Sequence, residues 1–356
     1  MSDRMKLGFR FLWMLLAGTI ALLAPAPSSA RDGLHFISDV GGRVEIRHRW
    51  GGGYRRAYPG DTLAPDDRLR VAPGGWVTVL CDNLSIWRAS PGELAVSDGC
   101  PTSTTGSASG SGFIRGQVDP ATLYLIYPPE TTIVTSNTPL QLRWNPIPGA
   151  TRYRIEIDPP YPMADWVVET EEPEVAYDDV LVPGRAYRVD ITAYQGDRTL
   201  TVSQENDFSV LDRDTEAHVR AEIERLQGES SLTGEGTVLA TVHLSRTHDL
   251  YGEAIALLRT WLSTAPPNPA MFELLGDLYR EVGLYREAQE AYLQAMEFVG
   301  DRVAVRASTR ASLGVVLAGL EENEAAIDWY RQAQSDYREL GDEEKVQELQ
   351  EAIDKL

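Results

Sequence analysis

The sequence contains few of the residues that usually build catalytic or metal centres. Its 356 residues include two cysteines and five histidines, the latter at positions 35, 48, 218, 243 and 248. The one close pair, His243 and His248, has no cysteine or suitably spaced carboxylate beside it. Nucleophile-elbow, HExxH, Walker and paired Cys–His patterns are also missing from the sequence. We therefore predict a protein that is not an enzyme and holds no metal and no cofactor.

Long apolar runs are also scarce, and one stands out near the N-terminus. Basic Arg4, Lys6 and Arg10 precede an apolar stretch over Phe11–Ala24, and small residues follow at Ser28–Ala30. This pattern predicts a secretory signal peptide over residues 1–30. The stretch, about 14 residues, is shorter than the roughly 20 that a helix needs to span a bilayer, which argues against a permanent membrane anchor. Such an anchor is the alternative interpretation. We expect a periplasmic or secreted protein whose only membrane contact is through this segment, if it stays uncleaved.

The two cysteines, Cys81 and Cys100, fall in the same segment of the chain. An even number of cysteines in one domain of an exported protein is usually oxidised. We predict a disulfide, which closes a loop of about 20 residues and contributes on the order of 3 kcal/mol in the chain-entropy account. The alternative, two free thiols, has no neighbouring catalytic motif to support it.

Positive charge is in short supply over most of the chain. Without residues 1–30, 30 basic residues stand against 52 acidic ones, a net charge of −22. Residues 31–100 are balanced, with nine arginines and nine acidic residues, so the acidity belongs to the later part. Nonspecific binding of nucleic acid requires a basic surface that neutralises phosphates. We therefore expect no nucleic-acid partner.

Residues 31–100 alternate apolar and polar side chains with a period of two, as in Val44–Arg47 and Trp76–Leu80. Breaks rich in glycine and proline separate these stretches, which predicts short strands and tight turns. The landmarks of the segment are Val40-x-Gly42-x-Val44, Gly60-Asp61-x-Leu63, Asp67-x-Leu69 and Gly75. In this order they resemble the extracytoplasmic domain of FecR-like regulators, which implies a small all-β domain. The cytoplasmic segment and spanning helix of those regulators are not found, so a signalling role is not expected.

Arginines and aromatic residues cluster around the glycine turn of this segment. Such a cluster can hold an anionic or sugar polymer through charge and cation–π contacts. Alternating outward arginines also serve simply to keep an exposed strand soluble and to protect its edge. The candidate polymer-binding residues are Arg43, Arg47, Arg49, Trp50, Tyr54, Arg55 and Arg56.

Residues 101–118 begin with a run of serine, threonine and glycine, which predicts a flexible linker. The β pattern returns over 119–212, where seven short strands predict a sandwich. Leu142 and Trp144 alternate inward, and Tyr187 opens a late strand of alternating Val189, Ile191 and Ala193. This stretch resembles a fibronectin type III domain, which implies a spacing role with Trp144 and Tyr187 in the core; such a fold does not by itself supply a function.

The last third of the chain contains a repeat. After a predicted connecting helix within 213–234, Tyr251-x-x-Ala254-x-x-x-Leu258 aligns with Tyr285-x-x-Ala288-x-x-x-Tyr292, a period of 34 residues, and Ala326-x-x-x-Tyr330 follows at a further 38. The pattern resembles the tetratricopeptide repeat, which implies three helical hairpins over 235–268, 269–302 and 307–340 and a capping helix over 341–356. Small Gly276 and Gly314 would let helices approach closely while Tyr292 and Tyr330 fill the adjoining space.

In that family the first helix of each hairpin lines a concave groove that binds a protein segment. Matched onto this sequence, the resemblance implies the partner contacts Leu239, His243, Arg246, Glu273, Asp277, Arg280, Glu281 and Val315. The alternative is that this face is exposed to solvent and binds no partner. The fold class expected is two all-β domains followed by an all-α array of helical hairpins. The leading function is an exported, non-catalytic scaffold that binds a protein partner; the alternative is an envelope protein that binds a glycan or anionic polymer.

Overall fold

A computed structural model describes most of the chain after residue 34. The described residues are 35–49, 53–101, 122–129, 131–132, 139–158, 164–203 and 206–356. Residues 31–356 form one compact unit. The predicted signal peptide, over 1–30, and most of the predicted linker lie outside the described residues. No helix among the described residues is long and apolar enough to cross a membrane.

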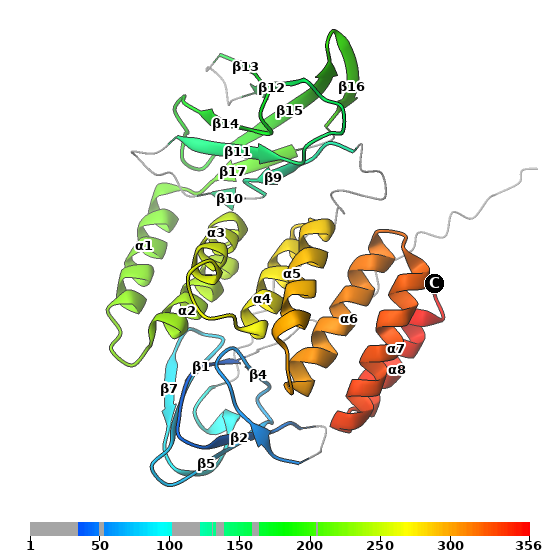
Figure 1. Ribbon diagram of the computed structural model, residues 1–356. Coiled ribbons are helices and arrows are strands. Elements are labelled where there is room, and N and C mark those ends of the chain that lie inside the picture. Colours follow the sequence, from blue (N-terminus) through cyan, green and yellow to red (C-terminus); the bar gives the residue numbers. More distant parts are fainter. Residues whose placement is uncertain are drawn as a thin grey trace, which may run out of the picture. The chain divides into compact units, whose positions relative to one another are not determined.

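The N-terminal β domain consists of two small antiparallel sheets (Figure 1), and side chains of both sheets form one core. One has the order β4-β1-β6-β7, with β1 at His35–Gly41, β4 at Thr62–Leu63, β6 at Trp76–Leu80 and β7 at Ile86–Ala89. The other has the order β3-β2-β5-β8, with β2 at Val44–Arg47, β3 at Arg55–Arg56, β5 at Arg68–Val71 and β8 at Gly92–Ala95. The alternation of the sequence places Val44, Ile46, Leu69 and Val71 inward. A short 3₁₀ helix, Val96–Asp98, follows β8.

The second β domain is a sandwich of two sheets. The smaller sheet has the order β14-β11-β9, with β9 at Leu125–Tyr127, β11 at Leu140–Trp144 and β14 at Glu174–Tyr177. The larger has the order β10-β17-β15-β12-β13, with β16 also paired to β15; its strands are β10 Thr131–Thr132, β12 Arg152–Asp158, β13 Trp166–Thr170, β15 Ala186–Gln195, β16 Arg198–Val202 and β17 Asn206–Val210.

The core of the sandwich contains the residues that the sequence placed there. Trp144 and Tyr187 are each 1% exposed, and Tyr187 stacks on Phe208 with ring centroids 5.1 Å apart. The Tyr187 hydroxyl accepts a hydrogen bond from the backbone N–H of Val182 at 2.7 Å. A tyrosine that ties the start of a late strand to the backbone just upstream is a hallmark of immunoglobulin-like sandwiches. The expected sandwich is therefore confirmed.

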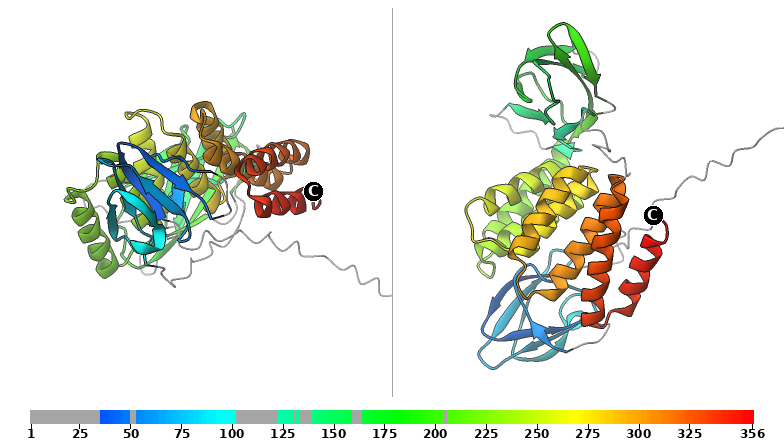
Figure 2. Two further views of the ribbon diagram at one scale, coloured as in Figure 1. Left: turned by 90° about the horizontal axis from the view of Figure 1, so that it is seen from below. Right: turned by 45° about the vertical axis from the view of Figure 1, so that its right-hand side comes forward.

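Eight helices follow (Figures 1 and 2). They are α1 Arg213–Gln227, α2 Gly234–Thr247, α3 Tyr251–Leu262, α4 Pro269–Glu281, α5 Tyr285–Phe298, α6 Val303–Gly319, α7 Asn323–Leu340 and α8 Glu343–Ile353. Helices α2 and α3, α4 and α5, and α6 and α7 pack as hairpins, and α8 packs on α7. Asn268 caps α4, whose first residue is Pro269, and Gly341 ends α7 in the left-handed conformation, with φ 82°.

Two glycines explain the close packing within the hairpins. A Cβ built on Gly276 would lie 2.5 Å from Cδ1 of Tyr292, and a Cβ built on Gly314 would also overlap the ring of Tyr330. Both rings are buried, at 0% and 4% exposure. The aromatic residue of the second helix therefore fills the space that the glycine of the first helix leaves open. The predicted array of tetratricopeptide-type hairpins is confirmed in its fold.

Candidate partner-binding surface

The eight predicted partner contacts lie on three helices. Leu239, His243 and Arg246 are spaced four and three residues apart and share one face of α2. The corresponding face of α4 carries Glu273, Asp277, Arg280 and Glu281, and that of α6 carries Val315. We call this the first-helix face of the array. The three helices differ in how much of this face is accessible.

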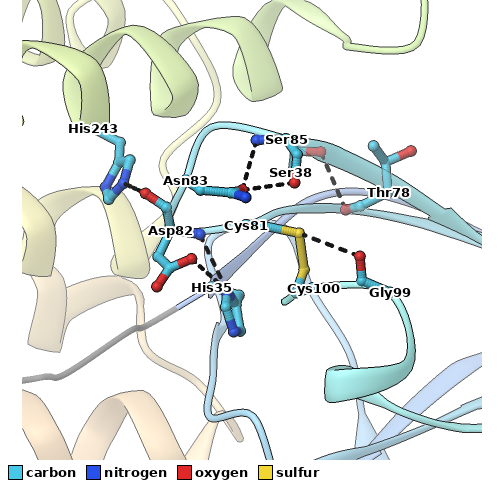
Figure 3. Close-up of a disulfide and its surroundings, with 10 residues drawn as sticks. All are labelled: His35, Ser38, Thr78, Cys81, Asp82, Asn83, Ser85, Gly99, Cys100 and His243. Atoms are coloured by element: carbon cyan, nitrogen blue, oxygen red, sulfur yellow. Dashed lines mark hydrogen bonds and ion pairs between the residues drawn. A yellow bond between two sulfur atoms is a disulfide. The ribbon is translucent and has the colours of Figure 1, made fainter. Parts of the chain in front are cut away.

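The N-terminal β domain covers the part on α2. Leu239 is only 3% exposed, and it lines one small depression together with Phe36 and His243. The rings of Phe36 and His243 meet edge to face, with centroids 5.7 Å apart. Nε2 of His243 donates to the backbone carbonyl of Asp82 at 2.9 Å (Figure 3). This part of the predicted groove is thus occupied by the chain's own β domain, which the repeat pattern gave no reason to expect.

Further contacts extend this interface to the beginnings of the first helices. The backbone N–H of Thr233, the residue that caps α2, donates to Oδ2 of Asp39 at 3.0 Å. The side-chain amide of Asn268 donates to the carbonyl of Pro59 at 3.1 Å, and Nη2 of Arg302 pairs with Oδ1 of Asp61 at 2.5 Å. Apolar side chains add one shared cluster, which contains Leu80, Val219, Leu226, Ala240, Leu244 and Leu250. The interface therefore combines polar pairs at the helix starts with an apolar centre.

The predicted contacts on α4 hold one another. Asp277 accepts a hydrogen bond from the Tyr292 hydroxyl at 2.8 Å, and the Arg280 side chain lies 3.3 Å from the same hydroxyl. Burial raises the pKa of Tyr292 well above its usual range, so the phenol stays a donor. Glu281 forms a double ion pair with Arg246 of α2, of which the Nε–Oε2 distance is 2.8 Å. Asp277 and Glu273 are also buried. These residues are better placed to fix the hairpins than to contact a partner.

Val315 is the exception on this face. It is 41% exposed in the C-terminal half of α6. The structure also exposes Leu293, at 41%, and Phe298 on α5, the second helix of the preceding hairpin. Phe298 stacks on Phe272 with centroids 5.7 Å apart. The repeat pattern did not single out Leu293 or Phe298.

The candidate polymer-binding residues do not form one patch. Arg43 pairs with Glu45 at 2.7 Å, and Arg47 lies over the Tyr54 ring, 5.2 Å from its centroid. Arg55 instead reaches the end of α7, where its Nη1 lies 3.9 Å from Glu339.

The remaining residues of that group point to different neighbours. Arg56 lies over the ring of Tyr58, 5.5 Å from its centroid. The backbone N–H of Arg49 donates to Asp67, and Trp50 lies outside the described residues. Arg70, which sequence reasoning missed, stacks closest on Tyr54, at 3.5 Å.

The predicted disulfide joins Cys81 to Cys100, with their Cα atoms 5.4 Å apart (Figure 3). It links the residue after β6 to the second residue after the 3₁₀ helix. His35, which is fully buried, lies beside it, and the three side chains bring their nitrogen and sulfur atoms within 4.8 Å of one another. Both sulfurs are joined in the disulfide and offer no thiolate, so we assign no metal to this group.

No protein-family model matches the chain, and no curated protein matches it. Solved structures are similar to parts of it. The fibronectin type III domain of human collagen alpha-1(XX) is 27% identical, with a TM-score of 0.18 over 24% of this chain and 74% of that one. The tetratricopeptide domain of Sgt2 from Aspergillus fumigatus is 18% identical, with a TM-score of 0.28 over 37% of this chain and 80% of that one.

MamA from AMB-1 is 19% identical, with a TM-score of 0.27 over 39% of this chain and 86% of that one. Similarities of this size carry no argument about function. The fold therefore rests on the strand pairing and helix packing described above, and the FecR-like resemblance of the first domain stays a prediction.

Proposed function

We propose that the chain is an exported, non-catalytic scaffold that binds a protein partner through the first-helix face of its helical array. Hairpins of this kind bury their faces against one another and leave the face of the first helices for binding. The periplasmic or secreted location and the FecR-like origin of the first domain belong to the same proposal. Both depend on sequence patterns, including the predicted signal peptide, which lies outside the described residues.

The exposure of Val315 is the observation that carries this proposal. Along the first-helix face, α2 is covered by the β domain and the charged residues of α4 are paired within the array. That leaves α6, where an apolar side chain stands 41% exposed on the predicted binding face. A partner segment with an apolar anchor would cover it, and such anchors supply much of the binding energy of an interface.

Capture from an envelope extract tests the proposal. Residues 31–356, which form the compact unit, serve as the immobilised protein. Val315→Glu should reduce retention of the partner at least about tenfold, because it places a charge in an apolar contact. Leu293→Glu is the matched control, since Leu293 is equally exposed but lies on the second helix of a hairpin. A partner retained equally by both variants, or no partner retained by the unaltered chain, contradicts the proposal.

A second candidate function, polymer binding by the N-terminal domain, has one observation in its favour. The outer side of the sheet β3-β2-β5-β8 gathers four arginines, Arg43, Arg47, Arg68 and Arg70, around two carboxylates, Glu45 and Glu93. Two positive charges are left in excess beside the Tyr54 ring, where Arg47 and Arg70 already stack. Co-sedimentation with cell-wall polymer that is lost with Arg47→Glu and Arg70→Glu, and unaffected by Val315→Glu, would favour this function over the first.

A further inference from the structure

The backbone of one residue, Asp82, at the interface between the β domain and α2 is held by two imidazoles. The backbone N–H of Asp82 donates to Nδ1 of His35 at 3.1 Å, and the carbonyl of the same residue accepts from Nε2 of His243 at 2.9 Å (Figure 3). His35 begins strand β1 of the β domain, whereas His243 comes from α2. Asp82 follows the disulfide-bonded Cys81, which fixes this end of β6. The contact therefore joins a rigid point of one domain to the first-helix face of the other.

The hydrogen bond to His35 requires a neutral ring, whereas the one from His243 can be made by either form, so for His243 the second nitrogen decides. Nδ1 of His35 can accept the Asp82 N–H only when it carries no proton. Nδ1 of His243 is buried and has no hydrogen-bond partner among the described residues, so a proton there would create an unsatisfied charged donor. Burial lowers the pKa of both imidazoles, in agreement with this geometry.

The charges that face the two rings act in opposite directions. Arg246, one turn along α2, favours neutral His243, and so does any charge on His35. The Asp82 carboxylate favours the charged form of both rings, with Oδ1 3.8 Å from Nδ1 of His35, and the more distant Asp67 acts on His35 in the same sense. The hydrogen bond from His243 to the Asp82 carbonyl also favours the charged form of that ring, but desolvation outweighs these contributions for both histidines. Both histidines therefore have a lower pKa in the closed interface than in the open one, where water solvates the rings.

Opening would change what the array presents. Phe36 and Asp82 are among the residues that cover the first-helix face of α2, where Leu239 is buried beneath the β domain. Separation there would make Leu239 on α2 accessible in addition to Val315 on α6. The covering domain thus competes for the same face that a partner would use.

We propose that the β domain is a proton-sensitive cover, which closes the first-helix face of α2 when His35 and His243 are neutral and uncovers it when they take up protons in mildly acidic surroundings. This inference rests on the proposed function, because it regulates the same face. The sign follows from proton linkage: the closed form binds fewer protons than the open one, so closure is complete above the ordinary histidine pKa of about 6.5 and is lost as the pH falls below it. Between that value and the closed-state pKa, each histidine contributes about a tenfold change in the opening equilibrium per pH unit.

Hydrogen exchange of residues 31–356 measures opening without any partner. After correction for the intrinsic pH dependence of exchange, the amides of α2 and of residues 80–86 should exchange about tenfold faster for each pH unit below 6.5, or faster still if both histidines protonate. His243→Gln keeps a donor near the position of Nε2 but cannot take up a proton there. It should remove at least half of the pH dependence, expressed as the logarithm of the rate. His218→Gln, on the exposed side of α1, is the matched control and should leave the pH dependence unchanged.

Asp61 requires a separate control, because burial raises the pKa of this carboxyl and its protonation would weaken the Arg302 pair in the same direction. The comparison of the histidine variants, rather than the pH profile alone, therefore decides the test. Equal pH dependence in the unaltered chain and in His243→Gln overturns the proposal, as does exchange that does not change between pH 7.5 and 5.0. If His243→Gln does not fold, NMR titration of the unaltered chain replaces it, and a His243 pKa above 6.5 contradicts the mechanism. Failure to find a partner would leave these readouts unaffected.

Discussion

Replacing Gly276 with alanine tests the packing on which the helical array depends. The added Cβ would lie 2.5 Å from both Cδ1 and Cε1 of Tyr292, whereas real Cβ contacts are essentially never below 3.0 Å. The ring cannot easily move aside, because Tyr292 is fully buried and its hydroxyl is bound to Asp277 at 2.8 Å. Overpacking of a rigid core costs about 1–3 kcal/mol.

Alanine also has an opposing effect, since it favours a helix over glycine by about 1 kcal/mol. At this position the ring carbons, rather than a flexible chain end, meet the new methyl group, so the overpacking cost should be at the upper part of its range. We expect the free energy of unfolding to fall by about 1–2 kcal/mol. In urea unfolding followed by far-UV circular dichroism, with a slope m of about 3 kcal/mol/M for a unit of this size, this corresponds to a midpoint lower by about 0.3–0.7 M.

Gly228→Ala is the matched control. It lies at the end of α1, where the nearest atom to a new Cβ is a backbone oxygen at 3.5 Å, an ordinary contact. Its free energy of unfolding should remain within about 0.5 kcal/mol of that of the unaltered chain. If Gly276→Ala were as stable as this control, the glycine would not be required for close approach, and our account of the hairpin packing would be refuted.

Two further predictions concern the N-terminal domain. Replacing Cys81 and Cys100 with alanine should lower the free energy of unfolding of the β domain by about 3 kcal/mol. Thiol labelling of the denatured, non-reduced, unaltered chain should detect no free cysteine. Labelling of either cysteine would contradict the pairing. Arg302→Gln leaves the Asp61 carboxylate without its ion-pair partner at a mostly buried site, so we expect a loss of about 3 kcal/mol and faster hydrogen exchange around Asp61. The exposed Arg331→Gln, as its control, should change stability by less than about 0.5 kcal/mol.

Local patterns predicted much of the fold. Strand alternation placed Leu142 and Trp144 in the sandwich core, and the 34-residue period placed Gly276 opposite Tyr292. These features depend on neighbours along a strand or within one hairpin, so the periodicity of the sequence records them directly. The pairing of Cys81 with Cys100 was also predicted, because the chain has no other cysteine.

The candidate site was predicted less completely. Leu239 and His243 were placed on one helix face, yet nothing in the repeat pattern indicated that Phe36 and Asp82 cover them. His243 and Asp82 are separated by 161 residues, and such a contact leaves no period in the sequence. The sequence also did not predict which charged residues pair with one another. Arg55 was grouped with the arginines near it in the sequence, but it pairs with Glu339, far along the chain.

The shared apolar clusters bear on how cooperatively the chain unfolds. Leu80 of the first β domain packs in one cluster with Val219 and Ala240 of the helices, and Tyr124 of the sandwich belongs to the core of the array. Cutting the chain at the ends of its recognisable sequence modules would expose these side chains on both fragments. Isolated modules should therefore be less soluble and less stable than the same residues in the intact chain, so the smallest unit suitable for dissection is larger than any single module.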